Sequence, residues 1–109
     1  MLNVAKGAAP AEGQLALAVT WEAKDGEQDT IASVLTRMAE AVQAEPGTLM
    51  FWTHRSTEND RIFFLYELYT GEDALAAHQQ TEWFKKLVLG EALPRLARRE
   101  RMYFKPMRS

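Results

Sequence analysis

Bulky and small side chains alternate in the first patterned segment of the chain. Between Gln14 and Ala23, Leu, Val and Trp at positions 15, 17, 19 and 21 alternate with Ala, Thr and Glu. A period of two residues predicts a β-strand with one bulky face and one small face. The small face, at Ala16 and Ala18, would leave space for a ligand if it turned toward the interior.

Helical periodicity follows the turn signal at residues 24–26. Apolar residues from Ile31 to Val42 recur at spacings of three and four, which predicts an amphipathic helix. Acidic residues near its start suit the helix dipole. Pro46 and Gly47 mark its end, because the residue before a proline is driven out of the α region.

Two further strands are predicted at residues 48–55 and 62–69, joined by a polar loop at 56–60. Apolar and aromatic side chains occupy both the odd and the even positions of this hairpin. An antiparallel hairpin usually has one hydrated face, so here both faces must be covered. The chain's own helices can cover one face. We expect a second copy to cover the other, as a homodimer formed through the sheet.

The last third of the chain predicts two helical segments and a closing strand. Residues 70–73 have the form of a capping box, which would open a helix containing His78. Thr81 can cap a further helical segment, and residues 101–105 predict a short strand. The resulting order, β-α-β-β-α-β, corresponds to a ferredoxin-like α+β fold with a four-stranded antiparallel sheet and helices on one face.

Composition narrows the class of protein. The 109 residues contain no cysteine, 47% are hydrophobic and 26% are charged, as in ordinary globular domains. We expect a flexible lead-in at residues 1–13 and a single domain at residues 14–109. The absence of cysteine rules out disulfide scaffolds and thiolate chemistry.

Charge and hydropathy exclude further classes. The net charge of −2 argues against nucleic-acid binding. No apolar run is long enough to span a membrane, and residues 1–13 lack the apolar core of a signal peptide, so we expect a cytoplasmic protein. Six basic residues between Arg95 and Ser109 are typical of a solvated chain end, with an anion site or substrate mouth as the functional alternative.

Two ionisable residues stand out as candidates for catalysis. His78 shares a helix face with Leu75 and should point inward, where an imidazole can act as a general base or orient a phenol hydroxyl. A core histidine that links helix to sheet is the structural alternative. Glu67 is a lone carboxylate in an aromatic strand, so it needs a partner, for which His78 or an arginine would serve. A structural hydrogen bond at the sheet or dimer interface is the alternative for Glu67.

Several aromatic residues and a second histidine could line a pocket for a flat ligand, although at these spacings they also suit a core or a dimer interface. They are Trp52, His54, Tyr66, Tyr69, Trp83 and Phe84. Two histidines without cysteine make a poor catalytic metal site, and the chain has no Gly-rich phosphate loop. We therefore expect neither a metal nor another cofactor.

Four short motifs, in this order and spacing, resemble the pattern of the antibiotic biosynthesis monooxygenase family. They are Glu45-Pro-Gly, Tyr66-Glu-Leu-Tyr69, Ala74-Leu-Ala-Ala-His78 and Thr81-Glu-Trp-Phe84. The resemblance covers roughly residues 15–105. It implies a ferredoxin-like fold paired through its sheets into a dimeric α+β barrel. Some members of the family oxygenate phenols or quinols with O₂ and without metal or flavin.

Other members degrade haem with a set of Asn, Trp and His residues. The matching positions here fall at Val19 or Thr20, at His78 and near Val88, which argues against haem degradation.

The resemblance and the residues together predict a cofactor-independent monooxygenase that oxidises a quinol or polyphenol-type aromatic with O₂. His78 would take or hold the phenolic proton, and Glu67 would fix the imidazole tautomer. Two alternatives remain open. One is an isomerase or degradative enzyme for a small oxygenated metabolite, and the other is a non-catalytic dimer that binds a small ligand.

Overall fold

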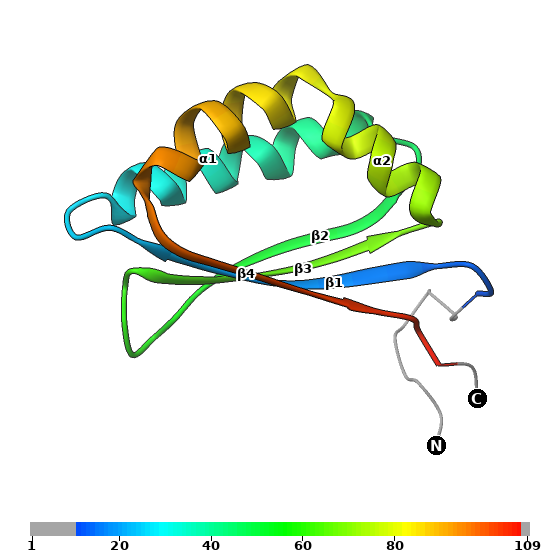
Figure 1. Cartoon of the computed structure of the whole chain (residues 1–109), viewed down its shortest axis with the longest axis horizontal. Coiled ribbons are helices and arrows are strands. Elements are labelled where there is room, and N and C mark those ends of the chain that lie inside the picture. Colours follow the sequence, from blue (N-terminus) through cyan, green and yellow to red (C-terminus); the bar gives the residue numbers. More distant parts are fainter. Residues whose placement is uncertain (1–10, 108–109) are drawn as a thin grey trace.

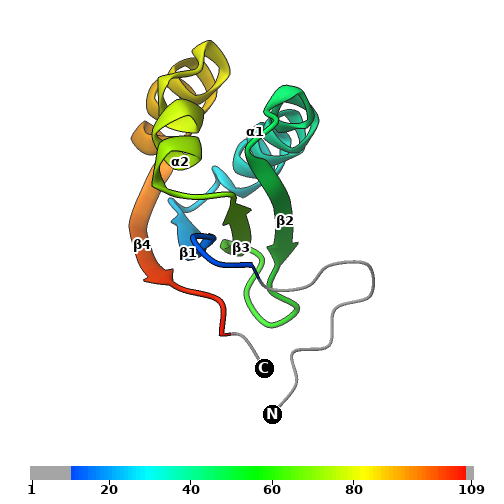
Figure 2. The ribbon, with the colours of Figure 1, turned by 90° about the vertical axis from the view of Figure 1, so that its right-hand side faces the viewer.

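Four antiparallel strands form one sheet, and all the helices lie over a single face of it (Figures 1 and 2). The structure is a computed structural model and describes residues 11–107. Most of the predicted lead-in, residues 1–10, and the last two residues lie outside that range. The spatial order is β2-β3-β1-β4. The strands are β1 (Leu15–Ala23), β2 (Thr48–Arg55), β3 (Ile62–Tyr69) and β4 (Leu96–Phe104).

Two helical runs connect the strands. The first is helix α1 (Gln28–Ala41) with a 3₁₀ turn, η1 (Val42–Ala44). The second is helix α2 (Glu72–Gln80), the π-helix η2 (Phe84–Ala92) and a 3₁₀ turn, η3 (Leu93–Arg95). The order confirms the ferredoxin-like α+β fold predicted from the sequence, with its four-stranded antiparallel sheet and helices on one face.

The bulky face of β1 turns toward the helices. Leu17, Val19 and Trp21 are buried in the core, so the intervening Ala16 and Ala18 belong to the opposite face of the sheet. Burying the larger apolar side chains removes more apolar surface from water, which decides the orientation. The small face of β1 therefore does not turn toward the interior, which was the condition for a ligand space above Ala16 and Ala18.

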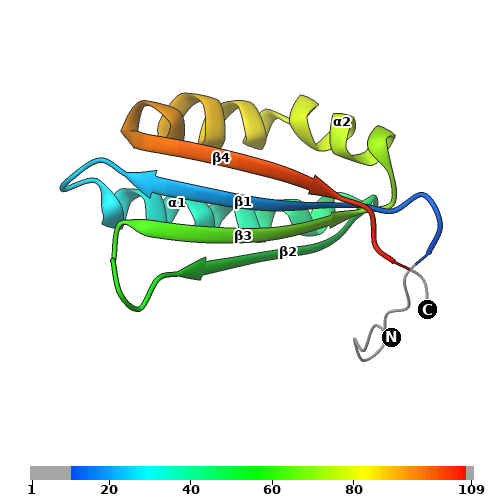
Figure 3. The same cartoon turned by 60° about the horizontal axis from the view of Figure 1, so that its bottom comes forward.

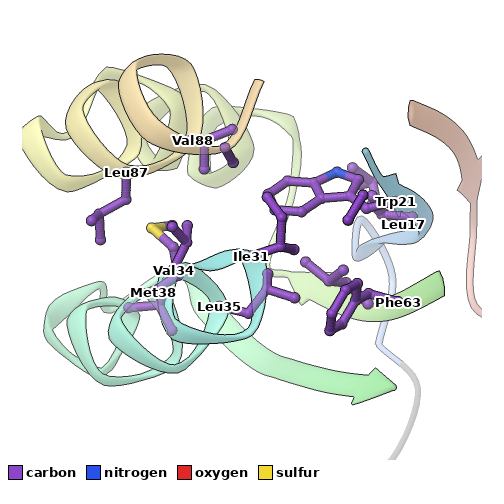
Figure 4. Close-up of a cluster of buried hydrophobic side chains, with 14 of the residues drawn as sticks. Leu17, Trp21, Ile31, Val34, Leu35, Met38, Phe63, Leu87 and Val88 are labelled. Carbon is purple, nitrogen blue, oxygen red and sulfur yellow. The ribbon is translucent and has the colours of Figure 1, made fainter. Parts of the chain in front are cut away.

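The core lies between the sheet and the helices. Figure 4 shows Ile31, Val34 and Met38 of α1 in a layer with Leu87 and Val88 of η2. The residues of the predicted apolar stripe of α1 are all buried. Residues 11–107 thus form one hydrophobic core, built across both helical runs.

Two local predictions were wrong. Strand β4 begins at Leu96 rather than at Arg101. The prediction began too late because charged residues are not typical of strands, although they are well suited to the edge of a sheet, where β4 lies. The capping box at residues 70–73 does not form: Gly71 precedes α2 and no side chain caps it. The acidic Glu72 and Asp73 still lie in the first turn, where the helix dipole favours negative charge.

Figure 3 turns the face of the sheet away from the helices toward the viewer. This face carries exposed apolar side chains. Trp52 and Met102 are 58% and 61% exposed, and Phe64 and Phe104 are also exposed. The register places Trp52, Tyr66, Ala18 and Met102 in one row across the sheet. We call this surface the open face.

Candidate functional site at the Glu45–His78 pair

A single carboxylate receives three side-chain donors where α1 ends. Glu45 lies just past η1, and its Oε1 accepts a hydrogen bond from Thr48 Oγ1 at 2.6 Å. Its Oε2 accepts one from Trp83 Nε1 at 2.5 Å. His78 Nδ1 lies 2.8 Å from Oε1 and 3.0 Å from Oε2. Three donors around one carboxylate compensate for its burial.

Close backbone packing brings these residues together. A Cβ atom built on Gly47 would lie 2.5 Å from the Cβ atom of Ala74, so only glycine allows α2 to approach the Pro46–Gly47 turn this closely. The N–H of Thr70 donates to the carbonyl of Gly47 at 2.9 Å, tying the start of α2 to the same turn. The chain therefore places Glu45 beside the helix that carries His78.

The imidazole of His78 is enclosed by aromatic rings. The side chain is 3% exposed, and its ring centroid lies 5.1 Å from that of Phe84, 5.5 Å from Tyr69 and 6.0 Å from Phe51. With Nδ1 directed at Glu45, Nε2 is the ring nitrogen left for other chemistry. A carboxylate that accepts the Nδ1 proton favours the tautomer in which Nε2 can accept a proton.

Glu67 has a different partner from the one predicted. Tyr69 donates its hydroxyl to Glu67 Oε1 at 2.5 Å, whereas the carboxylate bonded to His78 is that of Glu45. Burial raises the pKa of Glu67, and the hydrogen bond from Tyr69 only partly opposes this rise. Burial and the Glu67 carboxylate likewise raise the pKa of Tyr69.

A small cavity lies between the sheet and the helices, beside the Glu45–His78 pair. Its volume is about 30 Å³, which is room for one or two water molecules. Glu67 and Phe51 line it from the sheet, His78 and Phe84 line it from the helices, and Arg99 lines it from the edge strand. Both predicted ionisable residues therefore face the same enclosed space.

The sheet divides the predicted site residues into two sets. Those on the helix side are Glu67, Tyr69, His78, Trp83 and Phe84. Those on the open face are Trp52, His54 and Tyr66. On the open face, His54 Nδ1 lies 3.0 Å from the carbonyl oxygen of Phe64, and the Trp52 and Tyr66 rings are 6.5 Å apart. Within one copy of the chain the two sets cannot line the same pocket.

Sequence reasoning missed Glu45 as a site residue. The Glu-Pro-Gly motif was interpreted as the end of a helix and as part of the family resemblance, although a carboxylate fixed at that end was a usable signal. Arg99 was not named as a candidate by itself; it belongs to the basic segment for which an anion site or substrate mouth was the functional alternative.

Among residues 11–107, no group of three or more His, Asp or Glu side chains is placed to hold a metal ion. No helix in this range has the length and apolar character that crossing a bilayer requires.

The chain belongs to the antibiotic biosynthesis monooxygenase family, whose model matches residues 15–88. The match includes Glu45, Glu67 and His78. Membership supports a monooxygenase-like function in general terms. A comparison with curated protein sequences gives no match.

Solved structures agree with the fold. A protein from Pseudomonas aeruginosa is 23% identical, with a TM-score of 0.81, over 88% of this chain and 96% of its own. A putative antibiotic biosynthesis monooxygenase from Nitrosomonas europaea is 20% identical, with a TM-score of 0.82, over 89% and 94%. Another from Caulobacter crescentus is 25% identical, with a TM-score of 0.79, over 87% and 91%.

Proposed function

We propose that this protein is a monooxygenase that oxidises a quinol or polyphenol-type aromatic with O₂, in the space between the sheet and the helices. The observation that carries the proposal is the Glu45–His78 pair beside the cavity. It supplies an oriented imidazole in surroundings made of aromatic side chains. Such surroundings suit a flat apolar ring and exclude water from the reaction.

His78 acts on the phenolic proton. With Nδ1 bonded to Glu45, Nε2 accepts the proton of a substrate hydroxyl, and Glu45 stabilises the imidazolium that forms. The resulting phenolate is electron-rich enough to pass an electron to O₂. Glu67 lines the same cavity and is a second candidate for handling a proton, because burial raises the pKa of its carboxyl above the ordinary value.

The reaction balances without an external reductant. A benzene-1,4-diol and O₂ give a hydroxyquinone and water. One oxygen atom enters a ring C–H bond, the other leaves as water, and the substrate supplies all four electrons that O₂ accepts. A flavin or metal is therefore not required by the stoichiometry.

Substrate binding requires the cavity to enlarge, because about 30 Å³ is smaller than an aromatic ring. Phe84 and Val88 of η2 line the cavity on its helical side. π-helical turns occur frequently at functional sites. Displacement of η2 from the edge of the sheet is the simplest route for the ring to enter.

The open face is the surface through which two copies pair. Trp52, Phe64, Met102 and Phe104 are exposed there, and four large apolar side chains on one face are typical of an interaction surface. A twofold pairing covers the same surface on both copies at once. In this arrangement Trp52, His54 and Tyr66 lie at the interface.

The proposed function is tested by O₂ uptake against a panel of hydroquinones and polyphenols, with ¹⁸O₂ used to follow the inserted atom. We expect one O₂ consumed per quinol, one labelled oxygen in the product and no accumulating H₂O₂. His78→Gln should lower kcat by about a hundredfold or more. Gln80→Ala, which changes an exposed residue of the same helix, is the matched control and should leave kcat unchanged.

Two outcomes would overturn the proposed activity, and a third would overturn only the role of His78. Uptake no faster than the uncatalysed rate across the panel would exclude quinol oxygenation. Substrate conversion without O₂ would favour the isomerase alternative. Equal rates for His78→Gln and the parent chain would remove His78 from the chemistry.

A further inference from the structure

Two arginines face the cavity from the edge strand without a carboxylate partner. In the β1–β4 register Arg99 lies opposite Trp21 and Arg101 opposite Val19, so both occupy the helix-facing side of the sheet. Both also line the cavity that holds Glu67 and His78.

Their neighbours along the chain are paired. Arg95 forms an ion pair with Glu27, and Arg98 pairs with Glu22 and Glu100. Within residues 11–107, neither Arg99 nor Arg101 takes part in an ion pair or donates a side-chain hydrogen bond. Ion pairing therefore differs between neighbouring arginines of one segment. The two arginines that face the cavity, Arg99 and Arg101, are the ones without an acceptor.

Two buried donors at the same place also lack acceptors. The Nε atom of Arg99 and the Nε1 atom of Trp21 are fully buried and form no hydrogen bond. Both residues line the cavity, and the Cβ atoms of directly opposed residues on neighbouring strands are about 5 Å apart. Buried polar atoms in native proteins are nearly always satisfied, so two orphaned N–H groups in one cross-strand pair indicate a missing acceptor.

The local charge favours an anion as that acceptor. Burial and the adjacent Arg101 lower the pKa of Arg99, while Glu67 opposes the change only in part. Glu67 already accepts the Tyr69 hydroxyl, and burial raises the pKa of its carboxyl. The positive charge at the edge of the cavity therefore lacks a full counter-charge.

We propose that Arg99, Arg101 and the Nε1–H of Trp21 form a subsite for the carboxylate of an aromatic substrate. A guanidinium presents parallel N–H groups that match the two oxygens of a carboxylate. Arg101 is exposed at the β4 edge of the sheet, whereas Arg99 is half-buried and Trp21 is buried. The carboxylate binds at this edge and directs the aromatic ring toward His78. The aromatic part of the inference rests on the proposed function.

Direct binding tests the subsite without turnover. The probes are benzoate and benzamide, which share one shape and differ in charge, titrated by calorimetry at low ionic strength. We expect benzoate to bind at least about tenfold more tightly than benzamide. Arg99→Gln should remove this preference and leave benzamide affinity unchanged.

Arg55→Gln is the matched control for charge. Arg55 faces the helix side from the opposite edge of the sheet, where Asp29 and the carbonyl of Asp60 already accept its hydrogen bonds. We expect the benzoate preference to survive this substitution. Trp21→Phe removes the indole N–H while keeping an aromatic ring, and should weaken benzoate binding selectively.

The inference fails if benzoate and benzamide bind equally, if neither binds, or if Arg99→Gln weakens both to the same extent. It also fails if inorganic phosphate binds as tightly as benzoate, because the site would then not select an aromatic carboxylate. Its failure differs from failure of the proposed function. Selective benzoate binding without O₂ uptake would support the subsite and exclude the oxygenase. O₂ uptake with equal binding of benzoate and benzamide would support the oxygenase and exclude the subsite.

Discussion

Glu45 Oε1 and His78 Nδ1 lie 2.8 Å apart, although 33 residues of chain separate them. This contact joins the end of the first helical run to the last turn of α2. It also determines which nitrogen of His78 is free. Because Thr48 and Trp83 bond to the same carboxylate, one side chain connects strand β2, helix α2 and the start of η2.

Loss of the Glu45 carboxylate should lower the stability of the fold. Glu45→Ala leaves the donors of His78, Thr48 and Trp83 without their acceptor, and we expect the free energy of unfolding to fall by about 2–4 kcal/mol. Urea denaturation measures the change. Glu40→Ala, at an exposed position of α1, should cost no more than about 0.5 kcal/mol. Similar losses for both variants would show that the cluster contributes little.

Close packing at Gly47 can be tested by compensation. Gly47→Ala should destabilise the fold by about 1–3 kcal/mol, because its new Cβ would meet the Cβ of Ala74 at 2.5 Å. Ala74→Gly alone should cost about 1 kcal/mol through helix propensity. The double variant should lose less than the sum of the two, as measured by thermal or urea unfolding. Additive losses would contradict the predicted clash.

Glu67 should make stability depend on pH. Burial raises its pKa in the folded state above the value of 4.5, so the folded chain binds more protons than the unfolded chain. The contribution of the protonated Glu67 carboxyl to the free energy of unfolding is fully present below pH 4.5. It is lost as the pH rises through the pKa that Glu67 has in the folded state. Glu67→Gln should remain neutral, so its stability relative to the parent chain should increase with pH.

Urea unfolding between about pH 4 and about pH 8 measures this difference. Glu58→Gln, in the exposed hairpin loop, should run parallel to the parent chain. A Glu67→Gln curve that is also parallel to the parent would show that the carboxyl titrates alike in the folded and unfolded states.

The open face should control assembly. Trp52→Glu places a charge on the proposed interface, and we expect a homodimer to become a monomer in analytical ultracentrifugation. Leu89→Glu changes another exposed apolar residue, on η2 in the helical layer, and should leave the mass unchanged. A parent chain that sediments as a monomer would exclude pairing through this face.

Local patterns were sufficient for most of the fold. The bounds of β2 and β3 agree with the predicted 48–55 and 62–69, because aromatic and β-branched residues flank a polar loop. The inward position of His78 followed from its spacing to Leu75 on one helix face. The start of β4 could not be predicted in this way, since charged residues lower its apparent strand propensity.

The sequence by itself determined the family, the order of elements and the burial of His78, because these depend on short-range periodicity and on motifs within a few residues. The tertiary structure decided the partners: Glu45 for His78, Tyr69 for Glu67, and a cavity for Arg99. Both faces of the hairpin are apolar, so its pattern could not select the inner one. The inner face was decided by packing, because burying the bulky face of β1 fixes which side of the sheet meets the helices. The same choice places the predicted site residues on opposite sides of the sheet.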